Sequence, residues 1–194
     1  MESDLELVQR FKKGEKEIFE KLVRRYQHKV YNTTYRMLGN REDAGDLAQE
    51  TFIRVYQNLD RFKEKANFAT WLFRITTNLC RDQLRKRKRE PATSSLTNRG
   101  DGEQEILIPD NQYSPEKVSI EQERKREIQN QLGKLPLEQR EILILRDIQD
   151  FSYHQIAEIL KISPGTVKSR LSRARRSLRD KLQGIVKGGI TDGS

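Results

Sequence analysis

Apolar side chains in the first half of the chain recur every three or four positions, the spacing that gathers them on one face of an α-helix. This pattern predicts a short helix around residues 5 to 11. It also predicts a long helix from Ile18 to Leu38, which ends at Gly39, a residue common after a last helical turn. No alternating strand pattern occurs in this half, so we expect a bundle of helices.

Two further helices in this half have recognisable first residues. Asn40 can cap a third helix, and Asn67 can cap a fourth that continues into a run of Lys and Arg until Pro91 ends it. The chain is expected to break between these helices at about residues 60 to 67. The inward face predicted for the fourth helix consists of Phe68, Trp71, Leu72, Ile75 and Leu79.

The pattern changes after residue 90. Residues 91 to 113 are polar, acidic and rich in turn-forming residues, which predicts a flexible linker. A helix is then predicted from Pro115 to about Leu132, and a further helix opens with Leu135 and Pro136, the proline in its first turn. The predicted fold class is all-α, with two small helical domains, the second of which ends in a helix-turn-helix. The expected divisions are a domain at 1–90, the linker at 91–113, a domain at 114–187 and a disordered tail at 188–194.

The pattern near the end of the chain predicts two helices joined by a very short turn. Ser152 can cap a helix from Tyr153 to Lys161, and Ser163 followed by Pro164 can begin the next helix. This spacing is typical of a helix-turn-helix, whose second helix lies in the major groove of DNA. The apolar face predicted for that second helix consists of Val167, Leu171, Ala174, Leu178 and Leu182.

The opposite face of this second helix is polar and basic. Residues 161 to 179 carry seven Lys or Arg and no acid. In a helix-turn-helix the first residues of the second helix reach base edges, while flanking cations pair with phosphates. The alternative is a basic helix surface that keeps the protein soluble. The predicted DNA-binding residues are Ser163, Thr166, Lys168, Ser169, Arg170, Ser172, Arg173 and Arg176.

The composition favours a polyanionic partner without identifying it. The 194 residues carry a net charge of +9, which suits DNA, RNA or an acidic membrane surface. No apolar run approaches the length of a membrane span and the acidic N-terminus is no signal peptide, so we expect a cytoplasmic protein. Cys80 is the only cysteine, which excludes a disulfide within the chain, and we expect it in the core. We expect no metal and no cofactor.

Two surfaces of the first domain are candidate binding sites. The outer face of the third helix carries acidic and amide side chains with Ile53 in their midst, which suggests a docking surface, although a single exposed isoleucine is ordinary. The fourth helix carries a basic stripe beside Trp71, a combination that suits single-stranded nucleic acid. A core tryptophan and a solvated helix end are the alternatives. The stripe consists of Arg74, Asn78, Arg81 and Arg85.

The chain resembles bacterial sigma factors of the extracytoplasmic-function class of the sigma-70 family in three segments, which occur in the family's order. These are DAGDLAQETFIRVYQNLDRF, FATWLFRITTNLCRDQLRKRKR and LPLEQREILILRDIQDFSYHQIAEILKISPGTVKSRLSRARRSL. The resemblance covers about residues 5 to 184, including the domain order and the linker. It implies an initiation subunit that binds core RNA polymerase and directs it to promoters of a stress or envelope regulon. Whether an anti-sigma factor holds it inactive stays open.

The resemblance also implies roles for individual residues. The third helix would dock on the clamp helices of the largest polymerase subunit through Asp46, Gln49, Glu50, Ile53 and Arg54. The segment after it would recognise the downstream (minus-ten) promoter element and hold a flipped base, through Arg61, Asn67, Trp71, Arg74, Asn78, Arg81 and Arg85. The helix-turn-helix would read the duplex upstream (minus-thirty-five) element, and its domain would meet the polymerase flap. Gly45 departs from the family, in which an acidic residue is common there, and this leaves the strength of polymerase binding open.

Two other functions compete with this interpretation. A DNA-acting enzyme of recombinase type can also carry a helix-turn-helix, but its chemistry needs a nucleophile with convergent arginines, normally on a fold that contains strands. A conventional dimeric activator should bind a palindromic duplex unaided, whereas a sigma factor should not until polymerase joins it. The helical first half favours a factor without enzymatic activity.

Overall fold

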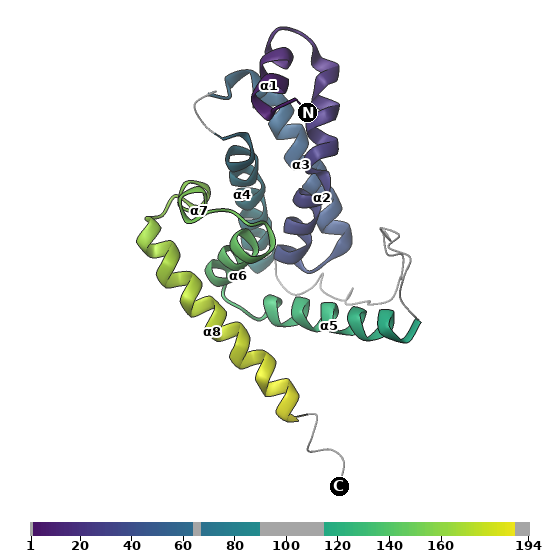
Figure 1. Cartoon of the computed structure of the whole chain (residues 1–194), viewed down its shortest axis with the longest axis vertical. Coiled ribbons are helices and arrows are strands. Elements are labelled where there is room, and N and C mark those ends of the chain that lie inside the picture. The colour runs from purple at the N-terminus through teal and green to yellow at the C-terminus, as the bar shows by residue number, and fades with distance from the viewer. Residues whose placement is uncertain (1, 64–66, 90–114, 189–194) are drawn as a thin grey trace.

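The computed structural model describes the backbone of residues 2–63, 67–89 and 115–188, and the side chains of these residues except 115–121 and 184–188. The predicted linker at 91–113 lies outside the described residues, as does the predicted tail apart from its first residue. The described first half contains α1 (Asp4–Lys12), η1 (Lys16–Ile18), α2 (Phe19–Leu38), α3 (Arg41–Asn58), η2 (Leu59–Arg61) and α4 (Phe68–Arg89). The second half contains α5 (Pro115–Gly133), α6 (Leu137–Leu143), the π-helical turn η4 (Ile144–Ile148), α7 (Tyr153–Leu160) and α8 (Pro164–Gly188). Figure 1 shows this order, and the described residues contain no strand.

The helices begin and end where local side chains satisfy free backbone groups. The carboxamide oxygen of Asn40 accepts from the Asp43 N–H (3.1 Å) at the start of α3. That of Asn67 accepts from the Thr70 N–H (3.1 Å) at the start of α4. Gly39 ends α2 in the left-handed region (φ 77°), which glycine adopts without strain. These positions agree with the sequence predictions for all three boundaries.

The first half is a bundle in which α2 packs against both α3 and α4. The core of the bundle consists of side chains from every helix, among them Leu7, Phe11, Leu22, Val30, Val55, Leu59 and Leu72. The short helix α1 is tied to α2 by Asp4, which accepts from the Tyr26 hydroxyl (2.5 Å) and pairs with Arg25. Burial and this bond raise the pKa of Tyr26 well above its usual value.

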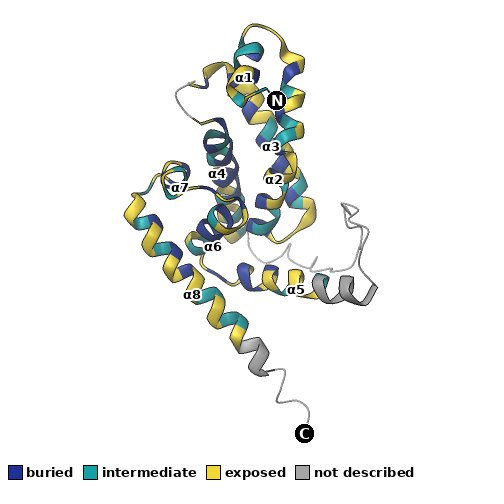
Figure 2. Cartoon of the chain, in the orientation of Figure 1, coloured by how far each residue is buried: buried dark blue, intermediate teal, exposed yellow. Residues whose placement is uncertain are grey.

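The inward face of α4 is broader than the sequence pattern predicted. Phe73 is fully buried although it was not placed on that face, and Cys80 is fully buried, which confirms its predicted place in the core. Trp71 and Ile75, both predicted to face inward, are only half-buried. The reason is that α4 is covered on a second side by the other half of the chain, so its burial pattern is not that of a helix with one dry face. Figure 2 shows the buried positions of α4 beside α7 and α6.

In the second half, the start of α6 differs from the prediction. Pro136 precedes the helix as its cap residue, so α6 begins one position later than a proline in the first turn would place it. The chain then continues from α6 into the π-helical turn η4, where Leu145 and Ile144 are fully buried. This wider turn leads to Asp150 (φ 59°), and Phe151 packs inward just before α7.

The two halves are packed together rather than separate. Direct contacts join α4 to α7, and α2 to α5, α6 and η4, and the largest apolar cluster contains residues of both halves. Figure 1 shows α7 beside α4, with α8 running away along the outside of the molecule. Among the described residues, no helix combines the length and apolarity that a membrane crossing requires.

Candidate nucleic-acid interfaces and docking face

The turn between α7 and α8 is fixed by its own side chains. The Ser152 hydroxyl accepts from the Gln155 N–H (3.3 Å) and the Gln155 carboxamide accepts from the Ser152 N–H (2.9 Å), which forms a capping box. Lys161 ends α7 in the left-handed region (φ 55°), and the Ser163 hydroxyl caps α8 by accepting from the Thr166 N–H (3.1 Å). This is the helix-turn-helix that the sequence predicted.

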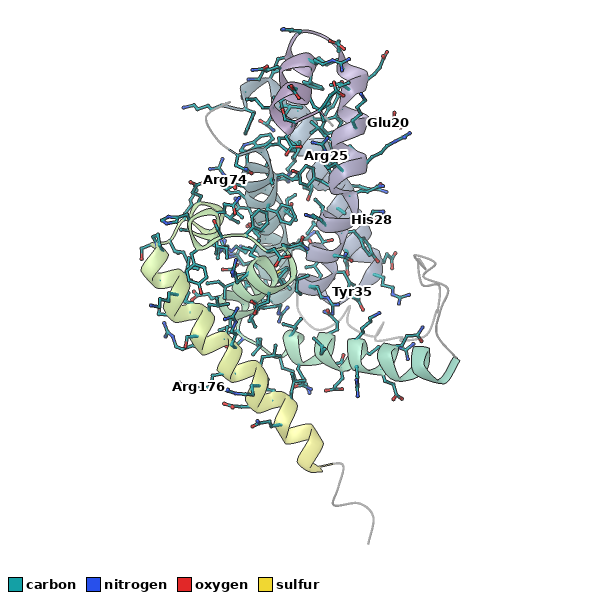
Figure 3. All side chains as sticks on the ribbon, in the orientation of Figure 1. Glu20, Arg25, His28, Tyr35, Arg74 and Arg176 are labelled. Atoms are coloured by element: carbon teal, nitrogen blue, oxygen red, sulfur yellow. The ribbon has the colours of Figure 1, made fainter. Side chains whose placement is uncertain are left out.

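The outer face of α8 is polar and accessible. Val167, Leu171 and Ala174 are buried, which fixes the rotation of the helix. The opposite face therefore exposes Lys168, Ser169, Ser172, Arg173 and Arg176. In Figure 3, Arg74 of α4 lies beside α7, while Arg176 lies further along α8 on the outside of the molecule. Five of the eight predicted upstream residues thus share one exposed surface.

The other three predicted upstream residues contact neighbouring protein groups. The Ser163 and Thr166 hydroxyls lie 2.8 Å apart within the cap of α8. Arg170 forms an ion pair with Glu138 of α6 (3.2 Å), and 26% of its side chain is exposed. These contacts hold the start of α8 in place.

A cationic groove of about 520 Å³ runs beside the exposed face of α8. It is lined by Tyr153, Lys168, Leu171, Ser172, Arg175, Arg176 and Arg179. Sequence reasoning missed Tyr153, Arg175 and Arg179 as site residues, although Arg175 and Arg179 follow Ser172 and Arg176 by three positions each. Such a groove suits a phosphate chain, since Arg and Lys are the usual phosphate partners.

Arg175, one of the residues that line this groove, forms an ion pair. The Arg175 guanidinium donates to both carboxylate oxygens of Asp147 at 2.5 and 3.1 Å. Hydrogen bonding to Asp147 raises the pKa of Arg175. Arg175, whose side chain is 53% exposed, thus lines the groove while it is paired with Asp147 of η4.

A separate hollow of about 310 Å³ lies between α3 and α4. It is lined by Arg54, Asn58, Arg61, Trp71, Ile75 and Asn78. The half-buried Trp71 ring is tilted against Phe62 (5.1 Å between centroids) and Phe68 (6.0 Å). The tryptophan is therefore both a core contact and part of the wall of the hollow, so the two interpretations of this residue are compatible. Asn58 and Ile75 were not predicted as site residues, and their spacing along the sequence gave no signal.

The remaining downstream candidates are not gathered in this hollow. Asn67 uses its side-chain oxygen to cap α4. Arg74 is half-buried, and the exposed Arg85 lies 3.7 Å from Asp82. Arg81 is bound by Glu141 of the second half. The structure thus does not leave the predicted basic stripe as one open surface.

The outer face of α3 is exposed as predicted. Ile53 is 51% exposed, and Asp46 and Gln49 are also accessible. Glu50 pairs with Arg54 one turn later (2.6 Å). Arg54 lies at the border between this face and the hollow, because it contributes to both.

Comparisons with known proteins agree on one family. The chain matches the family models described as Sigma-70 region 2, over residues 22–90, and Sigma-70, region 4, over residues 125–178. It is 38% identical over 185 residues to the ECF RNA polymerase sigma factor SigW of Bacillus subtilis, covering 92% of this chain and 96% of that protein.

Two solved structures are similar over most of the chain. One is CnrH in complex with the cytosolic domain of CnrY (TM-score 0.70, 26% identity, 94% and 99% covered). The other is the sigma factor RpoE of Bartonella quintana with the anti-sigma factor NepR (TM-score 0.66, 29% identity, 85% and 96% covered).

Proposed function

The chain belongs to the extracytoplasmic-function class of sigma-70 family sigma factors. On this premise we propose which of its surfaces binds RNA polymerase and which bind the two promoter elements. The protein binds core RNA polymerase and promoter DNA and directs initiation at promoters. Polymerase supplies the chemistry of RNA synthesis, so this chain contributes binding and positioning. An anti-sigma factor is a further partner, as for the related RpoE, and the cytoplasm is the proposed place of action.

The main observation in support of the proposal is the hollow between α3 and α4. Trp71 offers a ring for stacking, and Asn78 offers an amide that can both donate to and accept from a base edge. Arg54 and Arg61 supply positive charge for the adjoining phosphates. A hollow of about 310 Å³ with these groups suits a single base taken out of the stack, so we assign it to the downstream element.

The exposed face of α8 is assigned to the upstream element. Lys168, Ser169 and Arg173 lie near the start of the helix, where a recognition helix meets base edges. The groove that contains Tyr153 and Arg175 then receives the phosphates on one side. The outer face of α3, with Ile53 at its centre, is left as the docking face for polymerase.

The competing functions find less support. Enzymes of recombinase type normally place their nucleophile on a fold with strands, and the described residues contain no strand. A dimeric activator differs from a sigma factor in a simple observable, since it binds its duplex without polymerase.

Transcription from a pooled promoter library by core polymerase, with and without this protein, therefore tests the proposal. Promoter-specific transcripts that require the protein are expected. Specific duplex binding by the protein alone, with no change in transcription, would favour the activator instead.

Replacing Arg173 or Arg176 with Ala tests the upstream assignment. Each exposed arginine should contribute to promoter binding by the polymerase complex. Loss of a base contact should cost about 1–3 kcal/mol and relax the preference at one position, whereas loss of a phosphate contact should reduce the salt dependence. Filter binding over a range of salt concentrations measures both effects. Arg24→Ala, which removes an arginine 73% exposed on α2, is the matched control. Wild-type binding by both α8 variants would remove these residues from the interface.

A further inference from the structure

The turn that forms one edge of the downstream hollow is held in place by the N-terminal helix. This turn, η2, is a single 3₁₀ turn that carries Arg61, one of the residues that line the hollow, and Phe62 follows it directly. Short 3₁₀ turns have poor hydrogen-bond geometry and leave carbonyl groups without partners. A turn of this kind has little stability of its own, so the positions of Arg61 and Phe62 depend on the groups packed against them.

Lys12, the last residue of α1, supplies one such group. Its ammonium group donates to the carbonyl oxygen of Phe62 (2.7 Å), in a partly buried contact between residues 50 positions apart in the chain. A hydrogen bond from a charged donor is stronger than one between neutral groups. Lys16 of η1 adds a second contact, since its ammonium group lies 3.1 Å from the Asp60 carboxylate of η2. That second pair is exposed and therefore contributes less.

α1 can act as a support because both of its ends are fixed. At its start, Asp4 accepts from the Tyr26 hydroxyl (2.5 Å). At its end, Phe11 is 1% exposed, and its ring packs against that of Tyr56 on α3 (5.3 Å between centroids). Figure 1 shows α1 beside the start of α2, at one end of the first half. Lys12, next to Phe11, thus holds its partner from a fixed place.

Phe62 connects this contact to the hollow. Its side chain is 3% exposed, and its ring centroid lies 5.1 Å from that of Trp71 and 5.9 Å from that of Phe68. Trp71 and Arg61 both line the hollow. Because protein interiors are close-packed, a shift of Phe62 displaces the rings that contact it. The position of the Phe62 backbone therefore affects both the ring offered for stacking and a cation of the same site.

We propose that Lys12 is a positioning residue for the downstream site: by holding the Phe62 carbonyl, it keeps the wall of the hollow in the arrangement that accepts a single unstacked base. Lys12 acts through Phe62 and needs no contact with DNA. The proposal rests on the function proposed above, because that function places a promoter base in the hollow. Loss of the lysine should therefore reduce recognition of that base more than the general attraction of the protein for DNA.

Lys12→Met removes the donor and keeps most of the side chain, and its first measurement needs no DNA. Trp71 is the only tryptophan of the chain, so the tryptophan fluorescence of the free protein reports on the hollow. The emission should move to longer wavelength and quenching by acrylamide should increase, because the ring becomes more accessible. Lys12→Arg retains a charged donor and should keep the wild-type signal. Lys13→Met, at the exposed neighbouring position, makes the same change in charge and should leave the signal unaltered.

The second measurement uses the complex with core polymerase and a labelled single strand. The probe carries the non-template sequence of the downstream element from a promoter selected in the transcription test, and matched probes have an abasic site in place of each base in turn. In the wild type, one position should show a clear preference for the base over the abasic site. In Lys12→Met this preference, measured by fluorescence anisotropy, should fall about fivefold or more. Affinity for the abasic strand and for the upstream duplex should equal that of Lys13→Met.

Wild-type fluorescence or wild-type base preference in a folded Lys12→Met protein would overturn the proposal. An equal loss of affinity for the intact and abasic strands would also overturn it, since this indicates a general loss of stability. If Lys12→Met does not fold, Lys12→Gln, whose amide donor is one bond shorter, takes its place, and failure of both to fold would show that the lysine serves folding instead. A wild-type complex without base preference at any position would contradict the function proposed for the hollow, whereas the fluorescence of the free protein tests the Lys12 contact independently of that function.

Discussion

Gly45 lies in the interior of α3, where nothing in the structure requires glycine. A Cβ atom added at this position would meet no atom within 4 Å. Gly45→Ala should therefore stabilise the protein by about 0.5–1 kcal/mol, because alanine loses less conformational entropy in a helix. Thermal denaturation followed by circular dichroism should show a rise of about 2–4 °C for a change near 1 kcal/mol.

Gly39 provides the opposite case for comparison. Its φ of 77° is strained for any other residue, so Gly39→Ala should lower the melting temperature although it makes the same chemical change. A lower melting temperature for Gly45→Ala would mean that glycine has a packing or functional role in α3. A longer side chain would also begin in open space at this position, since its Cβ atom would meet no atom within 4 Å.

At the scale of elements, the sequence predicted most helix boundaries because the signals are local. Asn40, Asn67, Ser152 and Ser163 cap helices through bonds to residues three positions away. Burial on α4 was predicted less well, because Phe73 is covered by Phe151, which is distant in the sequence. The downstream hollow was predicted only in part, because some of its residues lie on one helix and others are brought to it by packing. Trp71 and Asn78 share one helix, but Asn58 comes from α3 and its position depends on packing.

The outer face of α3 can be tested through its predicted binding to core polymerase. Ile53→Asp should weaken binding to core polymerase about tenfold or more if this side chain is central to the interface. Folding should be nearly unaffected, because Ile53 is 51% exposed. Leu5→Asp, at a side chain 41% exposed on α1, makes the same kind of change on another surface and should bind normally. Native gel or calorimetric titration measures affinity, and circular dichroism measures helicity. Unfolding of the Ile53 variant would place this residue in the core instead.

At the scale of the whole molecule, the sequence predicted two domains but not their contact. The residues that make this contact carry no local signal of it, since Glu141 and Arg140 are charged side chains on a short helix that would be expected in solvent. Glu141 is nevertheless 1% exposed, because Arg81 lies opposite it. Burial of a charge is decided by its partner, and that partner is 60 residues away in the chain.

The length of the segment between the two halves determines whether they can separate far enough to read a promoter. Residues 91 to 113 can extend over roughly 75 Å at about 3.3 Å per residue, which just exceeds the ~70 Å of two DNA turns. Deleting about a dozen of them should leave each half folded and able to bind its own partner, but abolish transcription from promoters that carry both elements. The remaining residues reach roughly half the required distance.

Scrambling the order of residues 91 to 113 is the matched control, because it preserves length, composition and charge. The scrambled protein should initiate normally in a reconstituted transcription assay with core polymerase, since reach depends on the number of residues. Full activity from the shortened protein would show that the segment does not act as a spacer. Loss of activity on scrambling would show instead that it makes sequence-specific contacts, and the distance argument would then no longer explain the effect of the deletion.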